Sequence, residues 1–262
     1  KIEFKLEGLD NHQIIFDDSI TLNGTVVPSQ EFYIRTQKIE PDIKGDFNLN
    51  IDLVEGKNTF DINFNNQNSQ LTIYHLVNYN DLSNHWLREP AAKLRYLEYL
   101  DTTPTFNPKQ VITRLDYIKY AASFFETDIP TSQNKLEIID LDDLEEYQAI
   151  VQYLVSNDVF SIYETNKFYP NKPMKRVEAL AATMKFLDLK YGNQNINNIK
   201  LPFWDVPKNH WGIDYIKKAY ASNYISKSVN FYPEKFITKD QLIAMFYKLP
   251  NVETKVKEYF EN

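Results

Sequence analysis

The stretch Phe106-Asn-Pro108-Lys-Gln-Val-Ile-Thr-Arg114 recurs twice further along the chain. The second copy is Phe168-Tyr-Pro170-Asn-Lys-Pro-Met-Lys-Arg176, and the third is Phe231-Tyr-Pro233-Glu-Lys-Phe-Ile-Thr-Lys239. In each copy the Phe precedes the Pro by two positions and the basic residue by eight, and the basic residues lie 62 and 63 positions apart. A fixed period of this length is typical of a repeated structural unit. The copies therefore predict three similar units, each presenting a cation at the same point, and favour a repeated binding surface over a single catalytic pocket.

The composition limits the classes of function. The 262 residues are 43% hydrophobic and include no cysteine, which excludes disulfides and thiolate metal sites. The net charge is −7, and residues 1–77 carry 6 Lys and Arg against 12 Asp and Glu. No basic stripe predicts nucleic-acid binding, and no run of 18 apolar residues predicts membrane insertion. A signal peptide is not visible, which would also be true of a mature or trimmed segment.

Residues 1–77 alternate apolar and polar residues in short runs separated by turns. The clearest alternation covers residues 45–53. Asn23-Gly24 predicts a hairpin turn, and residues 55–58 predict another turn. Short alternating strands with frequent turns indicate an all-β sandwich.

From about residue 78 the spacing of apolar residues becomes helical. Two helices are expected for each copy, at residues 89–100, 114–125, 143–155, 176–189, 210–224 and 239–248. Polar linkers are expected at 127–134 and 191–198. One helix pair cannot bury its apolar face alone, so we expect the three units to pack on one another.

The second helix of each unit has a predicted start. Thr113 with Asp116, and Thr238 with Gln241, have the spacing of N-terminal capping boxes, whereas the second copy has Lys175 in place of the Thr. The caps would place the repeated cations at the first helical position, where the helix dipole disfavours a positive charge. Two explanations stay open. The cations bridge to a neighbouring repeat or pack over Pro and Phe, or they bind a carboxylate or phosphate ligand.

A His-Trp pair recurs in the first and third copies. Trp86 and Trp211 precede the Phe of their copies by 20 positions, and an acid, Asp81 or Asp205, lies shortly before each pair. A Trp at the start of an amphipathic helix usually anchors a core, and the alternative is a wall of a ligand groove. We interpret the four histidines as structural, because none has metal-ligand spacing to another.

No arrangement of residues predicts catalysis, a metal or a cofactor. The acidic run at residues 140–146 lacks the glycine and alternating ligands of a calcium loop, and it is read as the start of a helix. No pairing of a nucleophile with a base, and no pair of carboxylates, stands out. We therefore expect no enzyme activity from this chain.

Together these motifs resemble three tandem S-layer homology (SLH) domains over about residues 78–250. The family pattern runs Asp-Val, His-Trp-Ala, an amphipathic helix, Gly-Ile, Phe-x-Pro and Ile-Thr-Arg-Ala-Glu. The second copy departs most, because it has no His-Trp. The Gly of Gly-Ile is absent from all three copies, which would leave some grooves degenerate or reshaped for another polymer. The pairs that stand near its place are Leu100-Asp101, Asp158-Val159 and Tyr224-Ile225.

The resemblance implies an all-α, pseudo-threefold bundle with binding grooves. Its repeats would be residues 78–133, 134–198 and 199–262, the last with a C-terminal tail. Such modules bind cell-wall polysaccharide or peptidoglycan-linked polymer, often with acidic sugars, and the Arg of Ile-Thr-Arg contacts the ligand. Arg114 matches that position best; the second copy lacks the Thr, and the third has Lys, which loses the bidentate fork. Our candidate ligand-site residues are Arg114, Arg176, Lys239, Trp86, Trp211, Asp81, Asp205, Thr113 and Thr238.

Residues 14–77 resemble bacterial Ig-like modules through Asn23-Gly24, Gly45-Asp-Phe47 and Leu53-Val-Glu-Gly56-Lys-Asn58. This implies a multidomain chain in which an Ig-like sandwich spacer, residues 1–77, precedes the SLH bundle. We expect an extracellular protein of the bacterial envelope, in the cell wall or S-layer, held non-covalently by an anionic wall polysaccharide. One alternative is a surface-array protein whose repeats bind other surface-layer subunits. Another is an accessory fragment of a surface hydrolase.

Overall fold

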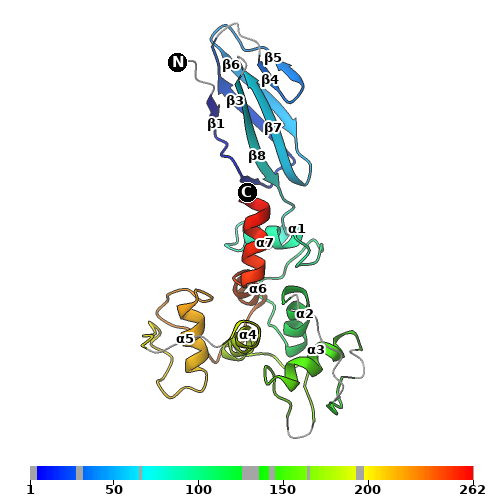
Figure 1. The fold of residues 1–262 in the computed structure, drawn as a ribbon, viewed down its shortest axis with the longest axis vertical. Coiled ribbons are helices and arrows are strands. Elements are labelled where there is room, and N and C mark those ends of the chain that lie inside the picture. Colours follow the sequence, from blue (N-terminus) through cyan, green and yellow to red (C-terminus); the bar gives the residue numbers. More distant parts are fainter. Residues whose placement is uncertain are drawn as a thin grey trace. The chain divides into compact units, whose positions relative to one another are not determined.

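The computed structural model describes residues 5–27, 32–64, 67–125, 136–141, 145–163, 166–192 and 198–261. A β-sheet region comes first, and a helical region follows it (Figure 1). The chain forms two compact units, Lys1–Pro104 with Val256–Asn262, and Thr105–Lys255. The linker expected at 127–134 and the boundary at 133 lie outside the described residues, as do parts of the second linker and of the acidic run. The four-domain division stays a prediction.

The strands form two sheets. Within the described residues the strands are β1 (Lys5–Glu7), β2 (Gln13–Ile15), β3 (Ser19–Thr25), β4 (Phe32–Ile34), β5 (Gln37–Ile39), β6 (Asp46–Asp52), β7 (Gly56–Phe64) and β8 (Gln67–His75). One sheet has the order β1-β3-β6 and the other the order β2-β8-β7-β4-β5. Only the pairing of β2 with β8 is parallel among these strands.

Both sheets contribute to one apolar core. Leu22 of β3 is fully buried, as are Phe60 of β7 and Ile73 of β8. The rings of Phe32 and Phe47, from different sheets, meet edge-on at 4.9 Å. Burial of each such side chain stabilises the fold by about 1.5–3 kcal/mol. The apolar residues of the predicted alternation therefore form the contact between the two sheets.

The hairpin turn predicted at Asn23-Gly24 is wrong. Strand β3 continues through both residues, and Gly24 pairs with Leu6 of β1 on one side and with Phe47 of β6 on the other. Buried residues alternate along β3 up to Gly24. Pairing on both edges and burial outweigh the local turn preference of Asn-Gly.

The turn predicted at residues 55–58 is wrong, because Glu55 bridges to His75 and strand β7 begins at Gly56. The Asn58 side chain accepts from the Val54 N–H at 3.1 Å and donates to the carbonyls of Val54 and Gly56, at 2.7 and 3.1 Å. Gly56 has φ of 92°, in the region that favours glycine. The motif that resembles an Ig-like module therefore supports the start of β7 through the buried side chain of Asn58.

Within the described part of the chain all six expected helices form, and the short 3-10 helix η1 and helix α7 were not expected. The helices are η1 (Asn80–Leu82), α1 (Arg88–Tyr96), α2 (Arg114–Phe124), α3 (Glu145–Ser156), α4 (Arg176–Tyr191), α5 (Ile213–Ala221), α6 (Lys239–Tyr247) and α7 (Pro250–Phe260). The tail predicted after the third copy is thus largely α7.

The three copies meet in a ring of extended segments just before α2, α4 and α6. The Ile112 N–H donates to the Ile237 carbonyl at 3.0 Å, Met174 donates to Ile112 at 2.9 Å, and Ile237 donates to Met174 at 3.0 Å. All three side chains are buried. The cycle relates the copies by a pseudo-threefold arrangement. It also adds isolated β-bridges that the expected all-α bundle did not include.

In the other compact unit, α1 and the end of α7 pack on the β-sheet region. The Tyr74 hydroxyl of β8 donates to the Tyr259 carbonyl at 2.7 Å, and the Tyr74 ring meets that of Phe260 at 5.0 Å. The Arg88 guanidinium of α1 lies 3.9 Å from the centroid of the Phe16 ring. The β-sheet region and the first helix of copy one are therefore one packed body.

Candidate ligand-binding site

Each repeated cation lies over the repeated Phe of the next copy. Arg114 lies 4.2 Å from the centroid of Phe168, and Arg176 lies 4.9 Å from that of Phe231. The Lys239 ammonium lies 4.5 Å from the centroid of Phe106, which closes the cycle. All three rings are buried. A cation over an aromatic face is favourable, and more so when desolvated.

The backbone forms the same cycle. The N–H of Arg114 donates to the Lys172 carbonyl at 3.0 Å, and that of Arg176 to the Lys235 carbonyl at 2.8 Å. The Lys239 N–H donates to the Gln110 carbonyl at 2.8 Å. Free N–H groups at the start of each helix are thus satisfied by the loop of the next copy. Each of these three contact regions is called a junction below: 1/2, 2/3 and 3/1.

Arg114 is buried in junction 1/2. Its Nε donates to the Phe168 carbonyl at 2.7 Å and its Nη2 to the Ser161 carbonyl at 2.8 Å. Burial lowers the pKa of the guanidinium below its ordinary value, while Tyr163 and nearby acids act in the opposite direction. The carbonyls and rings explain how a cation is accommodated at the first helical position. Of the two explanations for the repeated cation, these contacts match the one in which it packs against the neighbouring repeat.

Arg176 is half-buried in junction 2/3. Burial lowers its pKa, and the carboxylates of Asp205 and Asp240 act in the opposite direction. Asp205 accepts the N–H groups of Phe231 and Tyr232, at 2.7 and 2.6 Å, and so holds the Phe-x-Pro turn beneath Arg176. The structure therefore brings two candidate residues, Arg176 and Asp205, into one junction.

The helix caps follow the sequence prediction in two copies. Thr113 and Asp116 form the reciprocal capping box at the start of α2. The Lys175 N–H donates to the Glu178 carboxylate at 2.7 Å, so the second copy keeps only the acidic half of the box.

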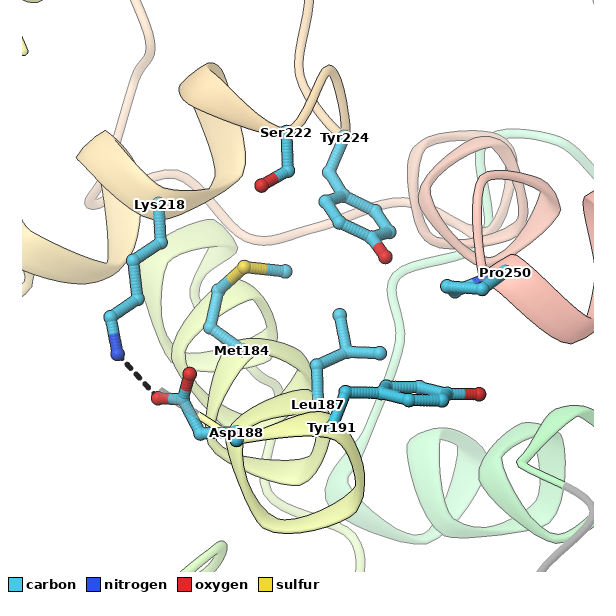
Figure 2. Close-up of a pocket in the computed structure, with 9 residues that line it drawn as sticks. Met184, Leu187, Asp188, Tyr191, Lys218, Ser222, Tyr224 and Pro250 are labelled. Carbon is cyan, nitrogen blue, oxygen red and sulfur yellow. Dashed lines mark hydrogen bonds and ion pairs between the residues drawn. The ribbon is translucent and has the colours of Figure 1, made fainter. Parts of the chain in front are cut away.

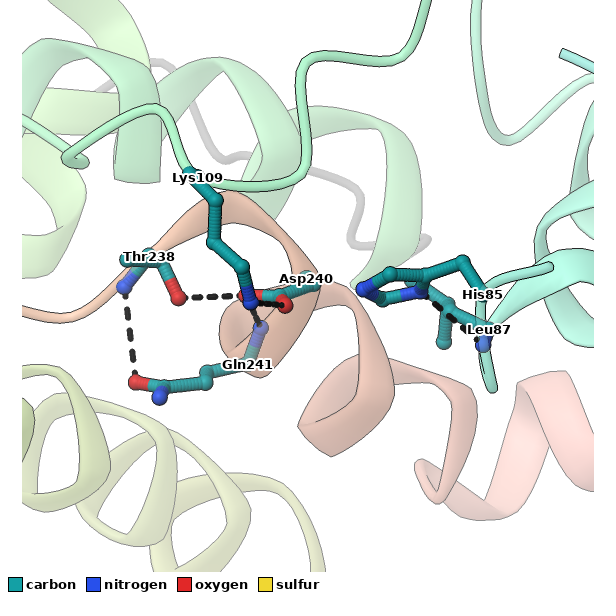
Figure 3. Close-up of polar contacts among 6 residues, drawn as sticks. All are labelled: His85, Leu87, Lys109, Thr238, Asp240 and Gln241. Carbon is teal, nitrogen blue, oxygen red and sulfur yellow. Dashed lines mark hydrogen bonds and ion pairs between the residues drawn. The ribbon is translucent and has the colours of Figure 1, made fainter. Parts of the chain in front are cut away.

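The third cap uses a buried acid instead. The Thr238 hydroxyl donates to Asp240, and Asp240 accepts the Gln241 N–H at 2.9 Å (Figure 3). Asp240 is almost fully buried and pairs with the Lys109 ammonium at 2.9 Å. Thr238 is thus a donor to a carboxylate rather than the acceptor that a capping box requires. Its N–H lies 3.5 Å from the Gln241 amide oxygen.

The two tryptophans of the His-Trp pairs are surface residues. Trp86 is 62% exposed and Trp211 is 59% exposed, so neither anchors a core. The histidine before each Trp accepts, through Nδ1, the N–H two residues further on, that of Leu87 (Figure 3) or Gly212. The histidines hold these turns and leave the indole rings accessible.

Junction 2/3 joins its exposed Trp to the start of α4. Trp211 lies 5.9 Å from the His210 ring, and His210 Nε2 lies 3.2 Å from Glu234. Glu234 also pairs with the Lys175 ammonium, directly before Arg176. Hydrogen bonds from Lys175 and then His210 lower the pKa of the Glu234 carboxyl. Trp86 and Asp81 belong to the other compact unit.

Several residues of the site were missed in the sequence. Asp140, read there as part of a helix start, accepts the N–H groups of Phe168 and Tyr169 at 2.7 Å each, as Asp205 does in the third copy. Trp204, which directly precedes Asp205, is 88% exposed. The sequence signal for Asp140 would have been its place before the Phe-x-Pro turn of copy two, which corresponds to the place of Asp205 in copy three. An insertion shifts it, since Asp140 precedes Phe168 by 28 positions and Asp205 precedes Phe231 by 26.

The missing glycines also have a structural counterpart. The residue two positions after the first helix of each unit has a left-handed backbone: Glu98 with φ of 63°, Asp158 with 57° and Asn223 with 61°. These positions favour glycine, and Asn and Asp tolerate them better than other residues. Of the places expected for Gly-Ile, Asp158-Val159 has this conformation, whereas in the other two copies it occurs at Glu98 and Asn223, before the expected Leu100 and Tyr224.

A small cavity lies between α4 and α5. Its volume is about 120 Å³, and Met184, Leu187, Tyr191 and Tyr224 line it (Figure 2). Lys218 and Asp188 form an ion pair at its edge. Burial is the main cause that raises the pKa of Tyr224 to about 12. The cavity lies near the C-terminal end of α4, away from Arg176 at its start.

The described residues hold no group of three or more His, Asp or Glu side chains that could bind a metal ion. Among the same residues, no helix has the length and hydropathy to cross a bilayer.

Comparison with known proteins identifies the repeats. The family model of the S-layer homology domain matches residues 78–118, 141–180 and 202–243. Three S-layer homology domains are thus detected in the chain. Each match contains one of the three repeated cations, Arg114, Arg176 or Lys239.

A curated relative extends the comparison. The chain is 25% identical over 144 residues to a protein of Acetivibrio thermocellus named "Cellulosome-anchoring protein". The similarity covers 53% of this chain and 32% of that protein, so the chain spans about a third of the relative. The three SLH domains are the part of the molecule in which the junctions described above are formed.

Proposed function

We propose that this chain anchors a bacterial surface protein to the cell wall, by non-covalent binding of an anionic wall polysaccharide to its SLH repeats. The β-sheet region would serve as an Ig-like spacer. The three SLH domains and the likeness to a protein named for anchoring support this location and role. No catalytic step is part of the proposal.

Junction 2/3 is the observation that carries the proposal. It combines an exposed indole at Trp211 with the cations Lys175 and Arg176 at the start of one helix. An exposed aromatic ring suits the C–H face of a sugar, and cations at a helix start suit an acidic substituent. The Trp211 ring is not part of a packed core, so folding does not explain its exposure.

Charge reversal of Arg114 is a poor test, because this buried side chain donates to two backbone carbonyls of the next copy. Trp211→Ala is better, since the ring is exposed. We expect wild-type chain to sediment with purified sacculi and to stay in solution when the acidic polymer has been extracted from them. Trp211→Ala should weaken co-sedimentation while the melting temperature stays unchanged. Equal sedimentation with intact and extracted sacculi would contradict the proposal.

Exposed apolar residues on the third repeat favour a second candidate function, assembly with other surface subunits. Trp204, Val229 and Phe236 are all exposed, and the Trp204 N–H donates to the Val229 carbonyl at 2.9 Å. Exposed apolar groups often mark protein contacts. Sedimentation velocity of the chain without glycan distinguishes assembly from anchoring to the wall polysaccharide. Concentration-dependent assembly without binding to sacculi would support the second candidate.

A further inference from the structure

The middle residue of Phe-x-Pro has a left-handed backbone in every copy. The φ angles are 58° at Asn107, 54° at Tyr169 and 59° at Tyr232. Asn tolerates this region, whereas a residue with a bulky side chain is strained there. Copy one therefore has the residue that suits the backbone, and copies two and three have a residue that does not.

Burial does not compensate for this strain. The side chain of Tyr169 is 39% exposed and that of Tyr232 is 44% exposed. Each turn is nevertheless held firmly, because Asp140 or Asp205 accepts the N–H of the Tyr and of the Phe before it. A strained, exposed and well-supported aromatic residue points to a function other than folding.

Both tyrosines lie in an aromatic and cationic setting. The Lys235 ammonium lies 4.1 Å from the centroid of Tyr232. The Tyr169 ring meets Tyr163 edge-on at 4.9 Å, and the Lys172 ammonium lies 4.5 Å from the Tyr163 centroid. The two lysines occupy the same position, two residues after the Pro of Phe-x-Pro, where copy one has Gln110.

These residues also lie beside the repeated cations. The backbone carbonyls of Lys172 and Lys235 are the acceptors for the first N–H of α2 and α4. Lys172 of copy two, which reaches Tyr169 through the Tyr163 ring, thus adjoins Arg114 in junction 1/2. The pair of copy three adjoins Arg176 in junction 2/3.

We propose that Tyr169 with Lys172, and Tyr232 with Lys235, are two sugar-binding platforms for an acidic polysaccharide. The tyrosine ring packs against the C–H face of a pyranose, and the lysine pairs with an acidic group of the same polymer. Junction 3/1, with Asn107 and Gln110 in these places, has no such platform. This inference rests on the proposed function and assigns its binding to two of the three junctions.

The test converts copies two and three to the residues of copy one. Tyr169→Asn with Lys172→Gln, and Tyr232→Asn with Lys235→Gln, should each lower affinity for soluble acidic wall polysaccharide by about tenfold. The tyrosine changes alone should leave the melting temperature unchanged or raise it, because strain is relieved. Tyr33→Asn, at an exposed strand position, is the matched control and should bind like wild type.

The outcomes are distinct. If wild type binds and both converted chains bind equally well, the platforms are refuted and the proposed function stands. A fall in melting temperature for Tyr169→Asn and Tyr232→Asn would show that the tyrosines support the fold, and would also refute the inference. No binding by wild type would overturn both proposals. Polymer with reduced carboxyl groups, and polymer with its phosphate removed, distinguish which acidic group is bound.

Discussion

Replacement of Arg114 by Ala should destabilise the compact unit formed by residues 105–255 by about 3–5 kcal/mol. The side chain donates to the carbonyls of Phe168 and Ser161, and hydrogen bonds from a charged group contribute about 1.5–3 kcal/mol each. Its position 4.2 Å from the Phe168 centroid adds about 0.5–2 kcal/mol. The expected loss is smaller than the sum of these contributions, because the energies of neighbouring interactions are not fully additive.

Urea unfolding followed by far-ultraviolet circular dichroism measures this loss. Arg114→Lys keeps the charge but not the planar fork, so it should cost about 1–3 kcal/mol, between wild type and Ala. Lys119→Ala, at an exposed position in the same helix, is the control and should change stability by less than about 0.5 kcal/mol. A cost below about 1 kcal/mol for Arg114→Ala would refute the view that the cations join successive copies.

Three further changes probe other parts of the molecule. Phe260→Ala should destabilise the unit containing the β-sheet region by about 3–5 kcal/mol, as measured by calorimetry, because it removes a buried ring packed on Tyr74; an unchanged transition would contradict that packing. Asp205→Ala should cost about 2–3 kcal/mol in urea unfolding, since two N–H groups lose their acceptor, whereas a loss below about 0.5 kcal/mol would show the turn forms without it. Glu234 has a lowered pKa, so its stabilising contribution is complete above the ordinary value of 4.5 and is lost as pH falls below it. Wild type and Glu234→Gln should therefore differ in melting temperature at neutral pH and converge in acid, and a constant difference would exclude this ion pair as the cause.

The period of the sequence predicted the repeats and the places of six helices, but not the partners of the repeated residues. Phe and cation keep a spacing of eight within a copy, yet each cation contacts the Phe of the next copy. That contact joins residues more than 50 positions apart, and spacing within one copy carries no information about it. The cap arguments did place each cation at the first helical position.

Local signals failed where distant pairing outweighed them. Asn23-Gly24 has strong turn preference, but strands on both sides hold it in β3. Helix α7 could have been predicted: Pro250 suits the first helical position, and Val252, Val256 and Phe260 recur every four residues.

The exposure of the candidate residues could not be predicted from their type. A Trp at the start of an amphipathic helix suggests a core anchor, yet Trp86 and Trp211 are both largely exposed. The strained backbone of Tyr169 and Tyr232 is likewise a property of the folded turn. It became visible only once the conformation of each Phe-x-Pro segment was known.

Isothermal titration of the wild-type chain with a purified acidic oligosaccharide from the wall polymer tests the central proposal most directly. The account predicts saturable binding at two sites per chain, one for each Tyr-Lys platform, with affinity that falls as salt is raised. Binding should be lost when the acidic groups of the oligosaccharide are removed. An absence of saturable heat, or equal affinity for the neutral oligosaccharide, would contradict anchoring through an anionic glycan.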